Sequence, residues 1–189
     1  SHKFNKYNNL NSDTMQPLRL TLLAFALAFV GLVLGHQLRS HLELGPATLP
    51  TSDARSEFLL PDLQGQMRNI REWDGKVIVL NFWATWCPPC RKEIPAFIKV
   101  QEELGPRGVQ FIGVAIDDRQ AVRDFSDEMG INYPLLTGEA DASAVAQTYG
   151  NRMLVLPFTA IINKAGQVVH AKAGELTQAQ VRNLLLPLL

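Results

Sequence analysis

The stretch Val77-Ile-Val-Leu-Asn-Phe-Trp83, followed after three residues by Cys87-Pro-Pro-Cys90, carries the strongest structural signal in the chain. Its first part is an apolar run with the length of a buried strand. The residues from Pro89 to Leu104 then read as a helix, because proline is accepted in the first turn of a helix. A strand that turns directly into a helix places Cys87 at the helix N-terminus, where unpaired N–H groups point outward.

This position predicts thiol–disulfide exchange. Helix N-termini and Cys-x-x-Cys spacing lower the pKa of a thiol from about 8.5 to roughly 3.5–7.5, so we expect Cys87 to be the nucleophile. Cys90 lies one helical turn later and can attack the mixed disulfide that Cys87 forms with a substrate, which leaves a Cys87–Cys90 disulfide. Pro88 and Pro89 restrict the loop between the cysteines, and we assign both to the substrate-binding surface.

Two other uses of a cysteine pair fit the sequence less well. A zinc site needs four ligands, but the chain has no second cysteine pair, and its four histidines show no paired spacing. They are His2, His36, His41 and His170. A purely structural disulfide would close a loop of a few residues and remove little entropy from the unfolded chain. We therefore expect no metal and no cofactor other than the redox-active pair itself.

Composition limits the class of protein. With 189 residues, of which 47% are hydrophobic, the chain can form one well-packed domain and little more. Lysine plus arginine balance aspartate plus glutamate at 18 each, so nothing indicates nucleic acid as a partner.

An uncharged run from Leu20 to Gly35 would span about 24 Å as a helix and approaches the thickness of membrane hydrocarbon. The residues after it lack a small-x-small cleavage site, which favours a retained anchor over a cleaved signal peptide or a buried core helix. We expect a cytoplasmic or added N-terminal extension at 1–17, a transmembrane anchor at 18–38, a linker at 39–53 and a catalytic domain at 54–189.

Basic residues around this run predict its orientation. Lys3, Lys6 and Arg19 precede it and Arg39 follows it, so the positive-inside rule favours an internal N-terminus and an exported domain. A single cysteine pair without spare thiols suits an oxidising compartment.

The remainder of the chain predicts alternating strands and helices. Two short strands around Gln64-Gly65 form an N-terminal hairpin, and the apolar run Val109–Ile116 pairs in parallel with the first long strand. We further expect helices over 119–129, 141–149 and 178–186, a short strand over 133–136, and an antiparallel pair over 158–163 and 167–171. This order predicts an α/β fold with a mixed central sheet covered on both faces.

Three features together carry a family resemblance. They are Asn81-Phe-Trp-Ala-Thr-Trp-Cys-Pro-Pro-Cys-Arg-Lys-Glu-Ile-Pro95, the Leu156-Pro157 step before an apolar strand, and the leading hairpin. From about Phe58 to Leu186 the chain resembles the thioredoxin superfamily, and more narrowly its membrane-anchored bacterial oxidoreductases of the TlpA, ResA and CcmG/DsbE kind. The resemblance implies a thioredoxin-like fold, a single pass through a bacterial inner membrane, and a catalytic domain in the periplasm or otherwise outside the cytoplasmic membrane.

The resemblance also assigns site residues. In that family a proline opposite the cysteines follows a cis peptide bond, and the neighbouring backbone accepts extended substrate. Pro157 and Leu156 match these positions, although the residues alone leave open a trans proline that opens a strand. Trp83 reads as core, while Trp86, adjacent to Cys87, is either a substrate contact or a structural aromatic.

Glu93, three residues after Cys90, has two interpretations. By resemblance to ResA-like proteins it assists proton transfer at the thiols, and we include it in the catalytic set; a carboxylate near a helix start also stabilises the helix dipole. Thioredoxin has a buried aspartate six residues before its first cysteine, where this chain has Asn81. An amide cannot carry a proton, so the proton transfer falls to Glu93 or to water.

Two classes of function remain. The first is an enzyme that passes electrons from Cys87 and Cys90 to disulfides in exported proteins. The resemblance suggests apocytochrome c or copper-site proteins as clients and a membrane electron donor of the DsbD/CcdA type. The direction depends on the reduction potential, so a disulfide-donating oxidant is the alternative within this class. The second class is a chaperone module that binds Cu(I) through the two thiolates. The exported part lacks the methionine enrichment of such modules.

Overall fold

The computed structural model describes residues 54–189. The expected extension at 1–17, anchor at 18–38 and linker at 39–53 lie outside the described residues. Among residues 54–189, no helix combines the length and the apolar character needed to cross a membrane.

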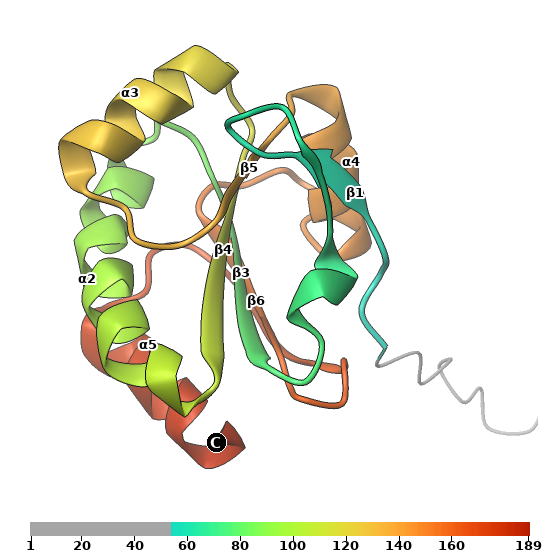
Figure 1. The fold of residues 1–189 in the computed structure, drawn as a ribbon, viewed down its shortest axis with the longest axis vertical. Coiled ribbons are helices and arrows are strands. Elements are labelled where there is room, and N and C mark those ends of the chain that lie inside the picture. The colour runs from blue at the N-terminus through green and yellow to red at the C-terminus, as the bar shows by residue number, and fades with distance from the viewer. Residues whose placement is uncertain (1–53) are drawn as a thin grey trace, which may run out of the picture. The chain divides into compact units, whose positions relative to one another are not determined.

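Five strands form the central sheet, in the spatial order β5-β4-β3-β6-β7 (Figure 1). Their bounds are β3 Val77–Trp83, β4 Val109–Ala115, β5 Leu135–Thr137, β6 Phe158–Ile162 and β7 Val168–Ala173. β4 runs parallel to both β3 and β5, whereas β6 runs antiparallel to both β3 and β7. The sheet is therefore mixed, which confirms the prediction.

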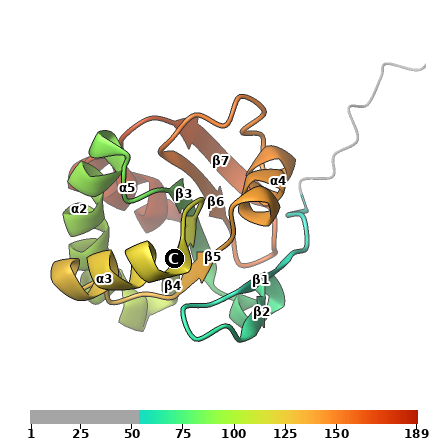
Figure 2. The same cartoon turned by 90° about the horizontal axis from the view of Figure 1, so that it is seen from above.

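Helices cover both faces of this sheet (Figures 1 and 2). One face carries α2 (Pro88–Leu104), α3 (Arg119–Met129) and α5 (Gln178–Leu185). The other face carries α4 (Ala140–Thr148), the short antiparallel pair of β1 (Leu59–Pro61) with β2 (Met67–Asn69), and the 3-10 helix η1 (Ile70–Trp73). Two further 3-10 turns follow α2 and α5, at η2 (Gly105–Arg107) and η3 (Leu186–Leu188).

The alternation of side chains along β3 divides the core in two. Val77 and Val79 pack with α2, α3 and α5, whereas Ile78, Leu80 and Phe82 pack with α4 and η1. All seven residues of β3 are buried, as expected for a central strand covered on both faces. The same alternation places the polar Asn81 on the face covered by α2.

Most expected element ends within the described residues differ by only one or two positions. The expected strand at 133–136 is wrong at its start, because the observed strand begins at Leu135. Tyr133 instead turns its ring toward Phe111, with 5.8 Å between ring centroids, and Pro134 has no N–H for a ladder. β7 continues beyond residue 171 because Ala173 still pairs with Phe158.

The described chain begins at the turn between β6 and β7. Ala54 forms an antiparallel bridge with Gln167, and the Arg55 N–H donates to the Gly166 carbonyl at 2.8 Å. The Arg55 guanidinium also pairs with Asp74, just before β3 begins. The entry point of the domain is thus fixed at the end of the sheet where β3 starts and β6 ends.

Candidate active site

Cys87 and Cys90 lie at the junction between β3 and α2 and are joined by a disulfide. Cys87 is the N-cap residue of α2, and its Sγ accepts a hydrogen bond from the Cys90 N–H at 3.4 Å. A thiolate on Cys87 would therefore receive an N–H of the first helical turn. Cys90 is fully buried, whereas Cys87 keeps a small exposed fraction. Cys87 is the sulfur that a partner can reach first.

A carboxylate two residues beyond the end of the neighbouring strand β4 fixes the turn before Cys87. Asp117 Oδ2 accepts hydrogen bonds from the Thr85 N–H at 2.8 Å and from the Thr85 hydroxyl at 2.6 Å. The parallel register brings these residues together, because Trp83 pairs with Ala115 at the last position of both strands. Asp117 was not among the site residues predicted from the sequence. Its position just after a predicted strand could have indicated the contact, because the carboxyl ends of parallel strands meet at the same edge of a sheet.

The Leu156–Pro157 peptide bond is cis, as the family resemblance predicted. β6 starts at the next residue, and its first pair, Phe158 with Phe82, sets Pro157 at the end of β3 from which the turn to Cys87 leaves. The Pro157 carbonyl accepts from the Gly174 N–H at 2.8 Å. The Leu156 side chain is half-buried against both cores.

The other residues assigned to substrate binding differ in exposure. The Trp86 side chain is 67% exposed and is the most accessible aromatic group beside Cys87, whereas Trp83 is buried with its ring 5.5 Å from that of Phe125. Pro88 is exposed and Pro89 is half-buried. The turn therefore presents Trp86 and Pro88 to solvent on either side of Cys87.

Glu93 is a buried carboxyl on α2, one helical turn after Cys90, and only 1% of it is exposed. Its Oε1 accepts from Asn81 Nδ2 at 2.8 Å, and its Oε2 accepts from the Leu176 N–H at 2.9 Å. Burial raises the pKa of Glu93 to about 7, although these two hydrogen bonds act in the opposite direction. A carboxyl with this pKa can gain or lose a proton near neutral pH, which is what an acid or base for thiol chemistry requires.

Asn81 connects Glu93 to the centre of the sheet. Its Nδ2 also donates to the hydroxyl of Thr159, the residue that pairs with it across β3 and β6, at 3.1 Å. Asn81 Oδ1 is buried and accepts no hydrogen bond from the described residues. A buried carboxyl and a buried amide with spare accepting capacity thus lie on the α2 side of the sheet. A role for Glu93 was expected from the family resemblance, but its burial and its contact with Asn81 were not predicted.

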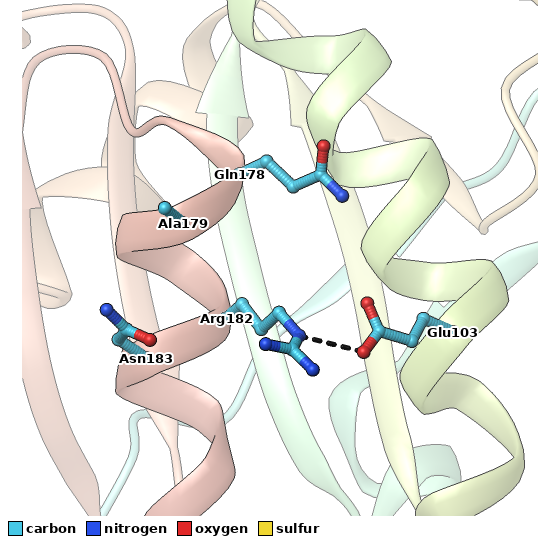
Figure 3. Close-up of a pocket in the computed structure, with 5 residues that line it drawn as sticks. All are labelled: Glu103, Gln178, Ala179, Arg182 and Asn183. Carbon is cyan, nitrogen blue, oxygen red and sulfur yellow. Dashed lines mark hydrogen bonds and ion pairs between the residues drawn. The ribbon is translucent and has the colours of Figure 1, made fainter.

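A shallow pocket of about 440 Å³ lies away from the cysteines, between the C-terminal part of α2 and α5 (Figure 3). Glu103 and Arg182 form an ion pair at 2.8 Å across it. No sulfur or buried titratable group lines this pocket. Within residues 54–189 no group of three or more metal-binding side chains converges on one point either.

Comparison with known proteins agrees with this geometry. The family model described as Redoxin matches residues 47–185. The thiol-disulfide oxidoreductase ResA of Halalkalibacterium halodurans is 31% identical over 160 residues, covering 84% of this chain and 89% of that protein. ResA of Bacillus subtilis is 29% identical over 158 residues, covering 82% and 86% respectively.

Solved structures show the same fold. A thioredoxin-family thiol:disulfide interchange protein from Chlorobium tepidum superposes with a TM-score of 0.65 at 26% identity, covering 71% of this chain and 94% of its own. A secreted thiol-disulfide isomerase from Corynebacterium glutamicum gives a TM-score of 0.66 at 26% identity, covering 71% and 84%. The chain therefore belongs to the redoxin family and is a thiol–disulfide oxidoreductase of the ResA-like branch of the thioredoxin superfamily.

Proposed function

We propose that this oxidoreductase acts as a reductase, passing electrons from Cys87 and Cys90 to disulfides in exported proteins. Family membership gives the class of reaction but not its direction, which depends on how well the site stabilises a thiolate. The observation that carries the proposal is Glu93, a buried carboxyl one helical turn from Cys90.

The charges around the cysteines favour the reducing direction. A strong oxidant owes its potential to a reduced form whose thiolate is stabilised. Glu93 supplies no positive charge in either protonation state. The two neighbouring cations are engaged elsewhere, because the Arg91 guanidinium lies 5.2 Å from the centre of the Phe125 ring and Lys92 pairs with Glu175 at 3.1 Å. These contacts give little support to a thiolate beyond that of the helix N-terminus.

The proposed reaction proceeds in two exchanges. The Cys87 thiolate attacks one sulfur of a client disulfide, forms a mixed disulfide and releases the first client thiolate, which takes up a proton. Cys90 then loses its proton to the Glu93 carboxylate and attacks the Cys87 sulfur, which releases the second client thiolate. Two electrons have passed to the client, and the protein is left with the Cys87–Cys90 disulfide.

We extend this proposal to the location of the protein, its clients and its electron donor. Residues 18–38 anchor the protein in a bacterial inner membrane with the domain on the outer side. The clients are exported disulfide-containing proteins such as apocytochrome c or copper-site proteins. A membrane electron donor of the DsbD/CcdA type returns two electrons to the Cys87–Cys90 disulfide after each cycle. The supporting observations are the uncharged run from Leu20 to Gly35 and the resemblance to ResA-like proteins.

The deciding experiment is the equilibrium reduction potential of the full chain against glutathione or dithiothreitol, followed by the fluorescence of Trp86 beside the cysteines. We expect a potential well below about −200 mV, toward the thioredoxin end of the range. A potential near −120 mV, where strong oxidants lie, would reverse the direction and make the protein a disulfide donor.

A further inference from the structure

The hydrogen bonds around the buried carboxyl of Glu93 fit only one of its two protonation states. Asn81 Nδ2 carries two hydrogens and uses both: it donates to Glu93 Oε1 at 2.8 Å and to the hydroxyl of Thr159 at 3.1 Å. The Leu176 N–H donates to Glu93 Oε2 at 2.9 Å. Both oxygens of Glu93 therefore face donors, which is the environment that suits an ionised carboxylate.

The protonated form of Glu93 finds no acceptor in this arrangement. Its O–H would meet Nδ2 of Asn81 or the N–H of Leu176, and neither group can accept a hydrogen bond. A buried O–H without a partner costs free energy. Burial nevertheless raises the pKa of Glu93 to about 7, so the carboxyl must hold a proton during part of any cycle near neutral pH.

The unpaired oxygen of Asn81 can supply the missing acceptor. Asn81 is 2% exposed, and its Oδ1 is buried and has no hydrogen-bond partner in the described part of the chain. A half-turn of the amide about its Cβ–Cγ bond exchanges Oδ1 with Nδ2, around a torsion that is roughly two-fold. Oδ1 then lies where it can accept from protonated Glu93 and from Thr159, because a hydroxyl both donates and accepts.

The charged and titratable groups around Glu93 do not replace Asn81 in this role. Glu175, before α5, raises the pKa of Glu93 and Lys172 on β7 lowers it, but each effect is smaller than that of the hydrogen bond from Asn81. Lys172 Nζ is itself bound to the Glu175 carbonyl at 3.1 Å. Burial and the charge of Glu93 both raise the pKa of Tyr133, so this phenol stays protonated.

We propose that Asn81 is a positioning residue whose amide turns whenever Glu93 gains or loses a proton, with the Thr159 hydroxyl as its second partner in both orientations. Its part in catalysis rests on the proposed function, in which the S–H bond of Cys90 breaks and an O–H bond forms on Glu93. The amide then turns its oxygen toward the new O–H, and it turns back when the proton leaves. Both states of the carboxyl are thus hydrogen-bonded.

The first test follows the amide by NMR in the oxidised full chain. In the observed orientation the NH2 group of Asn81 lies against Thr159, so nuclear Overhauser effects between the two side chains should be strong at pH 9, where Glu93 is ionised. At pH 5 they should weaken severalfold, because the NH2 group has turned away. Glu93→Gln has no proton to titrate and should show one pattern at both pH values. The same pattern at both pH values in the unchanged chain would overturn the inference.

The second test removes the amide. Asn81→Leu takes away the donor and the acceptor together, so the midpoint of the Glu93 titration, read from its carboxyl carbon shift, should stay within about 0.5 of the unchanged value. A fixed donor would stabilise the carboxylate alone. Its loss would raise the midpoint by about one unit or more and contradict the turning amide.

The positioning role predicts a kinetic effect as well. Asn81→Leu should slow the attack of Cys90 on a Cys87–glutathione mixed disulfide about fivefold or more, as followed by tryptophan fluorescence. The matched control is Asn132→Leu, since Asn132 also donates to α2, at the Ile98 carbonyl, but lies on the surface. It should leave the rate and the midpoint unchanged. Equal rates in the two variants would remove the positioning role.

The proposed function can fail separately from this inference. If Glu93→Gln resolves the mixed disulfide as fast as the unchanged chain, the proton transfer from Cys90 to Glu93 is wrong. The Overhauser effects and the titration midpoint still decide whether the amide of Asn81 turns.

Discussion

Asn81 in β3 donates a hydrogen bond of 2.8 Å to Glu93 in α2, and both side chains are buried between the sheet and the helix. The contact joins a strand to the helix that carries the resolving cysteine. It means that the protonation of Glu93 affects the stability of the whole domain as well as the chemistry at Cys90.

The first prediction concerns stability and pH. The pKa of Glu93 is raised by burial from 4.5 to about 7, so between these values the unfolded chain has lost a proton that the folded chain still holds. The free energy of unfolding must then fall as pH rises through this window, by about 3 kcal/mol. Denaturant unfolding of Glu93→Gln between pH 4.5 and 8 should lack this decrease. Glu103→Gln, the same exchange at an exposed position of α2, should retain it.

The second prediction places an acid where this chain has Asn81. Asn81→Asp would set two carboxyl groups within hydrogen-bonding distance, and like charges so close cannot both ionise at low cost. Asn81→Asp should lower the free energy of unfolding at both pH values. We expect this loss, relative to the unchanged chain, to be about 2–3 kcal/mol larger at pH 8 than at pH 5. The double variant N81D/E93Q should lose this additional pH dependence. A penalty of the same size at both pH values would contradict the charge argument.

The third prediction tests how the turn before Cys87 is held. Asp117→Ala removes two hydrogen bonds to Thr85 and should lower the free energy of unfolding by about 1–3 kcal/mol. It should also slow the reaction of reduced protein with oxidised dithiothreitol severalfold, because Cys87 is no longer fixed. Asp118→Ala is the matched control. It removes only the N-cap of α3, which costs about 1 kcal/mol, and should leave the thiol reaction unchanged.

The fourth prediction separates the two sulfurs. Cys87→Ser should abolish disulfide reduction, because the accessible nucleophile is lost. Cys90→Ser should instead accumulate a mixed disulfide between Cys87 and the client, which a non-reducing gel and mass spectrometry would detect. Accumulation in Cys87→Ser rather than in Cys90→Ser would mean that the roles of the cysteines are exchanged.

The features that the sequence could predict are those that depend on residues close together along the chain. The run Val77–Trp83 and the Cys87–Cys90 spacing lie within one continuous segment, so the strand and the helix start follow from neighbouring residues. Whether Trp86 is exposed was left open by the sequence. The cis bond before Pro157 was predicted only through the family resemblance, because most prolyl bonds in folded proteins are trans.

The remaining site features depend on contacts between distant segments. The burial of Glu93 requires α2 and the segment before α5 to close over Asn81, and Leu176 lies far along the chain. Asp117 reaches Thr85 only because β3 and β4 pair in one particular register.

Ala54 and Arg55 are fixed at the β6–β7 turn, so the described chain begins at the end of the sheet opposite to Cys87. β6 runs from the reactive end at Phe158 to Ile162, a rise of about 13 Å between these two residues, before the chain reaches that turn. Any pull exerted through the residues before Ala54 therefore acts on the pole opposite Cys87. A client can therefore approach Cys87 from the opposite end of the sheet, and a force applied at Ala54 would load the β6–β7 turn before the redox pair.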